Sequence, residues 1–262
     1  MYHERVMIHP TAMIEEGAII AHSAQIGPYA IVGSRVTIGD GTTIGGHSII
    51  TGRTSIGKNN KIFNHVSMGE VPQDKKYKDE DTTLTVGDGN VIREFCTLNT
   101  GTIQDRGDTS IGNNNWIMAY VHVAHDCFIG NNTILANCVQ LGGHIIIEDQ
   151  VFLGGFTGVH QFCRVGAHAM TGVGSVVLAD IPPFVTVMGN KAKPHGINSE
   201  GLKRLGYDSE VISDIKRAYK IIYRSRFTLD EAVQKLGLEM GDSAPVKKMI
   251  NFIVGSKRSI VR

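Results

Sequence analysis

The chain has 262 residues, among them 31 Gly, 9 Phe, 7 Tyr and 1 Trp, and its 26 basic and 25 acidic side chains leave a formal net charge of +1. This balance excludes the strongly basic composition typical of nucleic-acid-binding proteins, and 42% hydrophobic with 19% charged residues excludes a disordered or collagen-like chain. No apolar run approaches the roughly 20 residues of a membrane helix, and the first residues have no signal-peptide stretch, so we expect a soluble, cytoplasmic protein without stable membrane insertion.

An aliphatic residue recurs at every sixth position over most of the chain. The series runs without exception from Ile8 to Met68 and resumes in phase at Val86. After a one-residue slip within residues 102–110 it restarts and runs from Ile111 to Val177, where only Thr171 departs from it. A period of six fits neither an α-helix nor an isolated amphipathic strand. It is typical of a prism with about three flat sides, each a short strand that points one aliphatic side chain inward, and with about 18 residues per coil.

The corners of such a prism require residues that tolerate left-handed backbone angles. Residues of this kind recur between the predicted strands: Asp40-Gly41, Asn59-Asn60, Asp88-Gly89, Asn113 to Asn115, and Asn131-Asn132. This requirement explains the glycine excess, and a narrow interior explains the shortage of aromatic residues. The sequence therefore predicts an all-β hexapeptide-repeat β-helix over residues 1–190, with loops near 69–85 and 102–110.

Helical patterns replace the repeat after residue 190. One predicted helix opens at Asp208-Ser209-Glu210, a capping box of the form Thr228-x-x-Glu231 precedes a second, and a third is expected near 244–254. We therefore expect a small α-helical C-terminal domain over residues 191–262. This part carries 15 basic and 8 acidic side chains, a net of +7, whereas residues 1–190 carry 11 and 17, a net of −6.

The four cysteines form no CxxC pair and have no secretory context. They are Cys96, Cys127, Cys138 and Cys163. We expect reduced thiols in a packed interior and no structural zinc site.

The 18-residue coil brings several histidines to one corner. Val123, Leu141 and Val159 occupy the same side on three successive coils, and two positions beyond them come His125, Gly143 and Gln161. By the same spacing His144 stacks on Asp126, while His122 and His160 flank the line. A corner side chain of a β-helix points to solvent or to a partner, so these groups are available for chemistry.

This set of residues suits acyl transfer. His125 can remove a proton from a hydroxyl, because the reference pKa of histidine lies near neutral pH. Asp126 or a nearby carbonyl can hold the required tautomer, and the N–H of Gly143 can stabilise an oxyanion. No Ser or Cys has an obvious nucleophile setting, which favours direct attack by the acceptor. Histidine clusters on β-helices also bind zinc, but zinc requires three well-aimed ligands, and we expect no metal here.

Several segments resemble UDP-N-acetylglucosamine O-acyltransferases, the enzymes of the first step of lipid A synthesis in Gram-negative bacteria. They are HVAHDC at His122 to Cys127, GGH at Gly142 to His144, VHQF at Val159 to Phe162, GEVPQDKKY at Gly69 to Tyr77 and NSEGLKR at Asn198 to Arg204. The resemblance covers essentially the whole chain. It implies a homotrimer of left-handed β-helices with active sites between subunits.

The same resemblance implies the reaction and the residues that perform it. A histidine matching His125 is the general base on the glucosamine 3-hydroxyl of UDP-N-acetylglucosamine, which attacks an (R)-3-hydroxyacyl thioester on acyl carrier protein. The family's aspartate matching Asp126 orients that base, and the amide matching Gly143 serves the oxyanion. No cofactor is implied beyond the phosphopantetheine arm that carries the donor. Family contacts to the nucleotide sugar and acyl chain match Gln73, Asp74, Lys76, His122, His144, His160, Gln161, Asn198, Glu200 and Arg204.

Three positions depart from the family pattern. Asn99 replaces a histidine expected to bind the sugar, and Leu205 replaces a second arginine that follows Arg204. Val173 stands where a glycine leaves room for the end of a long acyl chain, so we expect a shorter hydroxyacyl donor. The basic C-terminal part suits an acidic carrier protein, and Arg204 suits the pyrophosphate of the nucleotide sugar.

Three alternatives to O-acyl transfer remain open at the level of sequence. An N-acyltransferase of the same fold, acting on a UDP-amino sugar, would use nearly the same base and oxyanion arrangement. The QDKKY and NSEGLKR segments favour the O-transferring branch. A zinc-dependent γ-type carbonic anhydrase and a non-catalytic scaffold are the other two.

Overall fold

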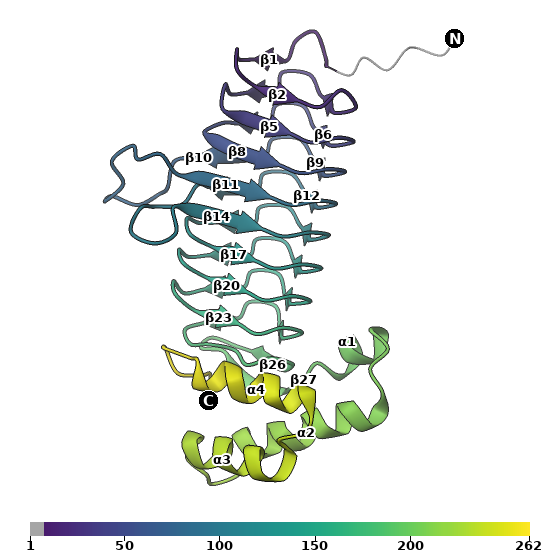
Figure 1. The fold of residues 1–262 in the computed structure, drawn as a ribbon, viewed down its shortest axis with the longest axis vertical. Helices are drawn as coiled ribbons and strands as arrows, with labels where there is room; N and C mark the ends of the chain where they lie inside the picture. Colours follow the sequence, from purple (N-terminus) through teal and green to yellow (C-terminus); the bar gives the residue numbers. More distant parts are fainter. Residues whose placement is uncertain (1–7) are drawn as a thin grey trace.

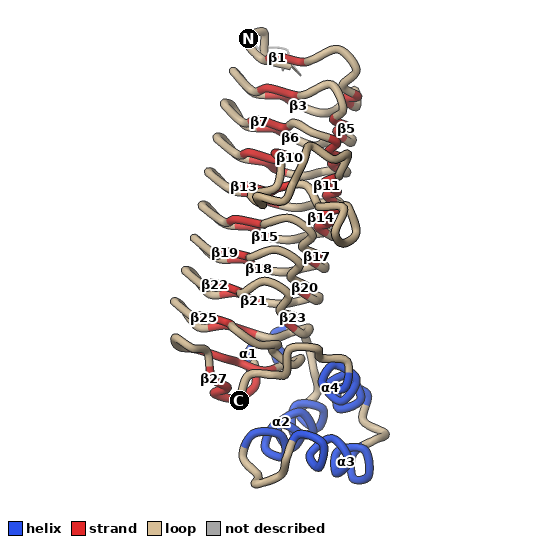
Figure 2. Tube along the Cα trace, turned by 90° about the vertical axis from the view of Figure 1, so that its left-hand side faces the viewer, coloured by secondary structure: helices blue, strands red, loops and turns tan. Residues whose placement is uncertain are grey.

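The structure, a computed structural model, describes residues 8–262. It is a tall prism of stacked coils, with a group of helices below the last coil (Figures 1 and 2). In Figure 1 the strands β5, β8 and β11 cross the front from left to right as the chain descends, and the chain returns behind them. Seen from the N-terminal end, the chain thus turns counter-clockwise as it moves away, which makes the β-helix left-handed and confirms the predicted fold class.

Each side of the prism is one sheet, and every third strand belongs to the same sheet. The first face consists of β1 (Met13–Ile14), β4 (Ile31–Val32), β7 (Ile49–Ile50), β10 (Ser67–Glu70), β13 (Thr97–Asn99), β16 (His122–Val123), β19 (Gln140–Leu141), β22 (Gly158–Val159) and β25 (Val176–Val177). The second face consists of β2 (Ile19–Ile20), β5 (Val36–Ile38), β8 (Arg53–Ile56), β11 (Thr83–Val86), β14 (Asp108–Ile111), β17 (Phe128–Ile129), β20 (Ile146–Ile147) and β23 (Arg164–Val165). The third face consists of β3 (Gln25–Ile26), β6 (Thr43–Ile44), β9 (Lys61–Ile62), β12 (Val91–Ile92), β15 (Trp116–Ile117), β18 (Ile134–Leu135), β21 (Phe152–Leu153), β24 (Met170–Thr171), β26 (Val185–Met188) and β27 (Lys193–Ile197).

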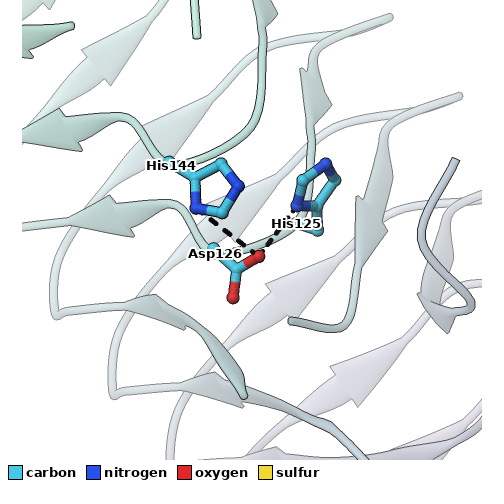
Figure 3. Close-up of side chains that lie close together, drawn as sticks. All are labelled: His125, Asp126 and His144. Carbon is cyan, nitrogen blue, oxygen red and sulfur yellow. Dashed lines mark hydrogen bonds and ion pairs between the residues drawn. The ribbon is translucent and has the colours of Figure 1, made fainter. Parts of the chain in front are cut away.

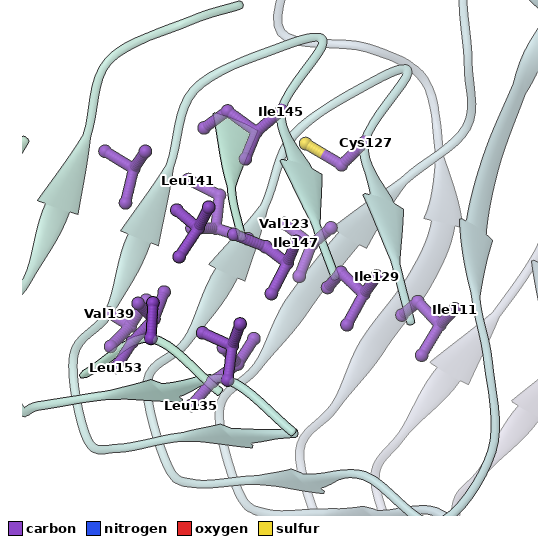
Figure 4. Close-up of a cluster of buried hydrophobic side chains, with 14 of the residues drawn as sticks. Ile111, Val123, Cys127, Ile129, Leu135, Val139, Leu141, Ile145, Ile147 and Leu153 are labelled. Atoms are coloured by element: carbon purple, nitrogen blue, oxygen red, sulfur yellow. The ribbon is translucent and has the colours of Figure 1, made fainter. Parts of the chain in front are cut away.

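The aliphatic series forms the core. Ile111, Ile129 and Ile147 pair in register on the second face and stack inside the prism (Figure 4). Thr171, the one residue of the second run that is not aliphatic, also points inward. Its hydroxyl lies 2.8 Å from that of Thr157, so this buried polar group has a hydrogen-bond partner. At the N-terminal end Ile8 is 40% exposed, because only one side of the first coil is covered by a described coil.

The corner between the second and third faces, here the asparagine corner, has the predicted chemistry. Gly41, Asn59, Gly89, Asn114 and Asn132 all have positive φ there. Beside them, the side chains of asparagine residues turn inward and donate to backbone carbonyls of the next coil.

Aromatic residues stand outside the prism at the corner between the third and first faces. Tyr29, His47, His65, Phe95 and Tyr120 form a continuous stack, with ring centroids 4.9–5.2 Å apart. This external position agrees with the prediction that aromatic rings do not fit inside the narrow prism.

Three of the four free cysteines are buried as predicted, and the fourth is not. Cys96, Cys127 and Cys163 are buried, whereas Cys138 is partly exposed. The packed-interior prediction was wrong for Cys138, because it occupies a corner position with φ of 62°.

Both predicted loops leave the prism at the corner between the first and second faces, here the histidine corner. The first loop, residues 71–82, joins β10 to β11, and the second loop, residues 100–107, joins β13 to β14; they project together to the left in Figure 1. The first loop therefore lies two coils before the coil that carries His125, and the second loop lies one coil before it.

The C-terminal part begins with an antiparallel strand. β27 folds back on β26, and the helices α1 (Ser199–Arg204), α2 (Ser209–Tyr223), α3 (Leu229–Met240) and α4 (Ala244–Val254) follow. The capping box at Thr228 is present. Neither β27 nor α1 was expected from local patterns, since both are short. No helix within residues 8–262 combines the length and apolarity needed to cross a membrane.

Candidate active site

The sheet register brings the predicted groups to the histidine corner. Val123 pairs with Leu141, and Leu141 with Val159, so the 18-residue spacing holds on three successive coils. His125, Gly143 and Gln161 follow these residues by two positions.

His125 and Asp126 form a direct pair. The Nδ1 atom of His125 lies 2.8 Å from Oδ2 of Asp126 (Figure 3). The backbone N–H and the hydroxyl of Thr102, in the second loop, donate to the two Asp126 oxygens at 2.9 and 2.6 Å. Burial alone would raise the pKa of the Asp126 carboxyl, but the hydrogen bonds from His125 and Thr102 bring it below its usual value. An ionised Asp126 holds the proton of His125 on Nδ1 and leaves Nε2 as the basic nitrogen.

Gly143 lies beneath the ring of His125. A Cβ atom at this position would come within 2.5 Å of Cε1 of His125, so any side chain would displace the imidazole. Within residues 8–262 the N–H of Gly143 donates to no protein acceptor. A hydrogen-bond donor is therefore available beside the base, as stabilisation of an oxyanion requires.

Two hollows flank the corner. The first-face groove, of about 560 Å³, is lined by Gln73 of the first loop together with five of the other predicted residues, namely His122, His125, Gly143, His160 and Gln161. The second-face cavity, of about 670 Å³, contains Asp74, Lys76 and His144. Burial, and then the nearby charge of His125, lowers the pKa of His122 and favours its neutral form.

The buried thiols near the corner are unsuited to nucleophilic attack. Burial raises the pKa of Cys127 to about 12 and that of Cys163 to about 11. A thiol is nucleophilic only as the thiolate, so both are packing residues.

His125, Asp126 and His144 each offer a ligand atom, all within 4.8 Å of one another. Asp126, however, uses both oxygens to accept hydrogen bonds from Thr102 and His125. These hydrogen bonds account for both carboxylate oxygens within the protein.

Comparison with known proteins identifies the family. An acyl-[acyl-carrier-protein]--UDP-N-acetylglucosamine O-acyltransferase of Thiobacillus denitrificans is 59% identical over 203 residues, covering 78% of this chain and 79% of the relative. The chain belongs to the UDP-N-acetylglucosamine O-acyltransferase family. The corresponding protein of Herminiimonas arsenicoxydans is 58% identical over 210 residues, 79% of this chain and 80% of the relative.

Family models and solved structures agree with this assignment. Residues 180–261 match the model for domain 2 of UDP-N-acetylglucosamine O-acyltransferase, and residues 17–52 and 108–143 match bacterial transferase hexapeptide repeats. The crystal structure of the Moraxella catarrhalis UDP-N-acetylglucosamine O-acyltransferase superposes with a TM-score of 0.95 at 45% identity, covering 98% of this chain and all of that chain. The Francisella novicida UDP-N-acetylglucosamine acyltransferase gives a TM-score of 0.95 at 42% identity, covering 98% and 94%.

Besides the buried Asp126, four of the predicted site residues line neither hollow. Asn198 caps α1 and donates to the carbonyl of His168 at 3.0 Å, and Glu200 pairs with Lys203 at 2.8 Å. Arg204 ends the same helix in an exposed position. Val173 stands at the corner between the third and first faces with 77% of its surface exposed. Within a single chain of this UDP-N-acetylglucosamine O-acyltransferase family member, these four residues therefore lie away from His125.

Asn99 and Leu205, the two other departures from the family pattern, lie in different environments, one buried and one exposed. Asn99 is 4% exposed and donates to the carbonyls of Glu70 and Val71, so it fastens the start of the first loop. Leu205 is the exposed C-cap of α1.

The site also contains residues that sequence reasoning did not single out. Thr102 and Asp105 come from the segment in which the repeat slips, and Phe162 stacks on His144 with centroids 4.3 Å apart. The repeat could have predicted the position of Phe162, because Phe162 lies 18 residues after His144. It could not have predicted the positions of Thr102 and Asp105, because loop residues outside the repeat have no fixed register with the coils.

Proposed function

We propose that this protein transfers an (R)-3-hydroxyacyl group from acyl carrier protein to the 3-hydroxyl of UDP-N-acetylglucosamine, the first step of lipid A biosynthesis. The observation that carries the proposal is the His125–Asp126 pair placed over the N–H of Gly143, which donates to no protein acceptor within residues 8–262. The names of relatives above 50% identity supply the two substrates.

In the proposed reaction, Nε2 of His125 takes the proton of the sugar hydroxyl as its oxygen attacks the thioester carbonyl. The new C–O bond forms a tetrahedral intermediate whose oxyanion accepts from Gly143. The C–S bond then breaks, and the imidazolium returns its proton to the departing thiolate. Asp126 stabilises the transient charge on His125, and no covalent enzyme intermediate is needed.

We propose that the nucleotide sugar lies in the first-face groove and reaches the histidine corner. Gln73, His122, His160 and Gln161 line this groove and offer groups for the sugar and diphosphate. Asp74, Lys76 and His144 approach from the second-face cavity.

The assembly we propose is a homotrimer with its sites between subunits. Asn198, Glu200, Arg204 and Val173 match family contact positions yet lie away from His125 within one chain. A neighbouring subunit that presents its α1 to the groove would complete the site, with Arg204 near the diphosphate.

The donor in this proposal is the acyl chain on the phosphopantetheine of acyl carrier protein, and no bound cofactor takes part. Residues 191–262 carry a net charge of +7, which suits an acidic carrier protein. A cytoplasmic location belongs to the same proposal, and the free cysteines are consistent with a reducing compartment.

The test is transfer from a panel of hydroxyacyl carrier proteins to UDP-N-acetylglucosamine, read by mass spectrometry, for wild type and His125→Ala. We expect a 3-O-acylated product and a fall in kcat/KM of about 10²- to 10⁴-fold in the variant, the usual contribution of general base catalysis. His22→Ala, which removes an exposed histidine elsewhere on the prism, is the matched control and should keep full activity.

Three results would contradict the proposal. One is unchanged activity in His125→Ala, which would point to a scaffold. Another is acylation of an amino group in a UDP-amino sugar with no O-acylated product. The third is stoichiometric zinc together with hydration of carbon dioxide and no transfer.

A further inference from the structure

The second loop brings an additional carboxylate to the histidine corner. Oδ2 of Asp105 lies 2.9 Å from Nδ1 of His144. The His144 side chain is 13% exposed, and that of Asp105 is 41% exposed. His144 and Asp105 are 39 positions apart in the sequence and come from different coils.

Asp126 cannot provide this contact. Its Oδ2 atom is 3.7 Å from Nδ1 of His144, which is too long for a hydrogen bond. The same oxygen already accepts from His125 at 2.8 Å and from the Thr102 hydroxyl at 2.6 Å. His144 therefore depends on Asp105 for an acceptor at Nδ1.

The ring of His144 is held in one orientation. It stacks on Phe162 at 4.3 Å with an interplanar angle of 8°, and it meets the edge of His125 at 4.9 Å and 88°. Its backbone N–H donates to the carbonyl of His125 at 3.0 Å. Since the ring is clamped, its hydrogen-bonding character depends on which nitrogen carries the proton.

We propose that Asp105 is a positioning residue that keeps the proton of His144 on Nδ1, so that Nε2 accepts a hydrogen bond from a hydroxyl of the sugar acceptor. Among the described residues, no protein group bonds to Nε2. The identity of the acceptor rests on the proposed function, whereas the tautomer does not. The corner then holds two imidazoles that both carry their proton on Nδ1 and present an accepting Nε2. Asp126 sets the tautomer of His125, which acts as the base, and Asp105 sets the tautomer of His144, which binds the acceptor.

The second loop has several contacts that do not involve the Asp105 side chain. The N–H groups of Asp105 and Gly107 donate to the carbonyl of Thr102 at 3.3 and 3.0 Å. The Arg106 guanidinium donates to the carbonyl of Asp126 at 3.0 Å and lies over the ring of Phe128 at 5.8 Å. A substitution at Asp105 should thus change His144 without releasing the loop.

The test compares Asp105→Ala, Asp105→Glu and the control Ile103→Ala, whose exposed side chain lies in the same loop. Nitrogen NMR of ¹⁵N-histidine-labelled full-length protein reports the tautomer, and a His144→Gln sample identifies the His144 signals. We expect Nδ1–H in the wild type and in Ile103→Ala, loss of that form in Asp105→Ala, and its return in Asp105→Glu.

Steady-state kinetics give the functional readout. In Asp105→Ala we expect KM for UDP-N-acetylglucosamine to rise about tenfold, the scale of one lost hydrogen bond, with a smaller change in kcat. Asp105→Glu should recover most of this loss. If Asp105→Ala keeps the Nδ1–H signal of His144 and the wild-type KM, the inference is wrong. If the wild type transfers no acyl group, the proposed function fails, while the NMR result still decides the role of Asp105.

Discussion

Side chains reach the histidine corner through an uncommon backbone conformation. Asp126, His144 and Phe162 have φ values of 59°, 62° and 65°, one residue per coil. Left-handed angles cost L-residues about 1–2 kcal/mol each. The coil contacts above and below keep each corner in this conformation, and the result is a vertical stack that points outward beside the loops.

The 18-residue spacing made part of this stack predictable. It stacks His144 on Asp126 and aligns His125 with Gly143 from the sequence alone. It could not place Thr102 or Asp105, because loop residues have no fixed position relative to the coils. It also could not tell whether Asn99 faces a ligand or the first loop, since that depends on where Glu70 and Val71 turn away from the strand.

Val173 provides a prediction about donor length. If its side chain closes the end of the acyl groove, Val173→Gly should shift the preferred hydroxyacyl donor to a longer chain. Each additional buried methylene contributes about 0.8 kcal/mol, or about fourfold in kcat/KM. Val173→Leu should shift the preference in the opposite direction. Competition between carrier-protein donors of different chain lengths measures the change, and an identical ranking in all three proteins would show that Val173 does not limit the groove.

Among the elements, the coils are joined by a ladder of buried amides inside the asparagine corner. The backbone N–H and the side chain of Asn90 both donate to Oδ1 of Asn60, and its side chain also donates to the carbonyl of Gly112. Its own Oδ1 accepts from the N–H of Asn115. One side chain thus connects three successive coils.

Asn90→Ala tests the contribution of this ladder. The change leaves two groups, the carbonyl of Gly112 and the N–H of Asn115, without the partner that the Asn90 side chain provides, and each such buried group costs about 1–3 kcal/mol. We expect a loss of about 2–4 kcal/mol in unfolding free energy, seen as a lower midpoint in urea followed by circular dichroism. Asn251→Ala, the same change at an exposed position of α4, should stay within about 0.5 kcal/mol. Equal midpoints for the two variants would mean that the ladder is not a source of stability.

The six-residue period of the sequence predicted the strands that belong to the repeat. The elements outside the repeat are determined by tertiary contacts. Strands of two residues were correctly predicted because each is one step of a regular series. By contrast, β27 is held by pairing with β26, and α1 by a cap from Asn198 that also bonds to the carbonyl of His168 in the last part of the prism. Such long-range contacts leave no local pattern to detect.

At the scale of the molecule, the prism and the C-terminal part have opposite net charge. Residues 1–190 have a net of −6 and residues 191–262 a net of +7. The overall value of +1 therefore conceals a basic end that carries α1 and Arg204. The basic C-terminal part can attract an acidic partner to the active site only if it lies near that site. Within one chain, however, it lies away from His125.

The proposed homotrimer with sites between subunits makes a quantitative prediction for mixed trimers. His125→Ala and Arg204→Ala should each be poorly active as homotrimers, because every site lacks one group. In any mixed trimer, one of the three interfaces pairs an intact His125 with an intact Arg204 of the neighbour. Random assembly at equal expression makes about three quarters of the trimers mixed, so co-expression should recover about one quarter of wild-type activity.

Mixing the two purified homotrimers without dissociation is the control and should recover nothing. Light scattering measures the assembly state of each sample. If both groups acted within one chain, neither variant would carry a complete pair, and co-expression would give no more activity than the control. The recovered fraction therefore distinguishes a site between subunits from a site within one prism.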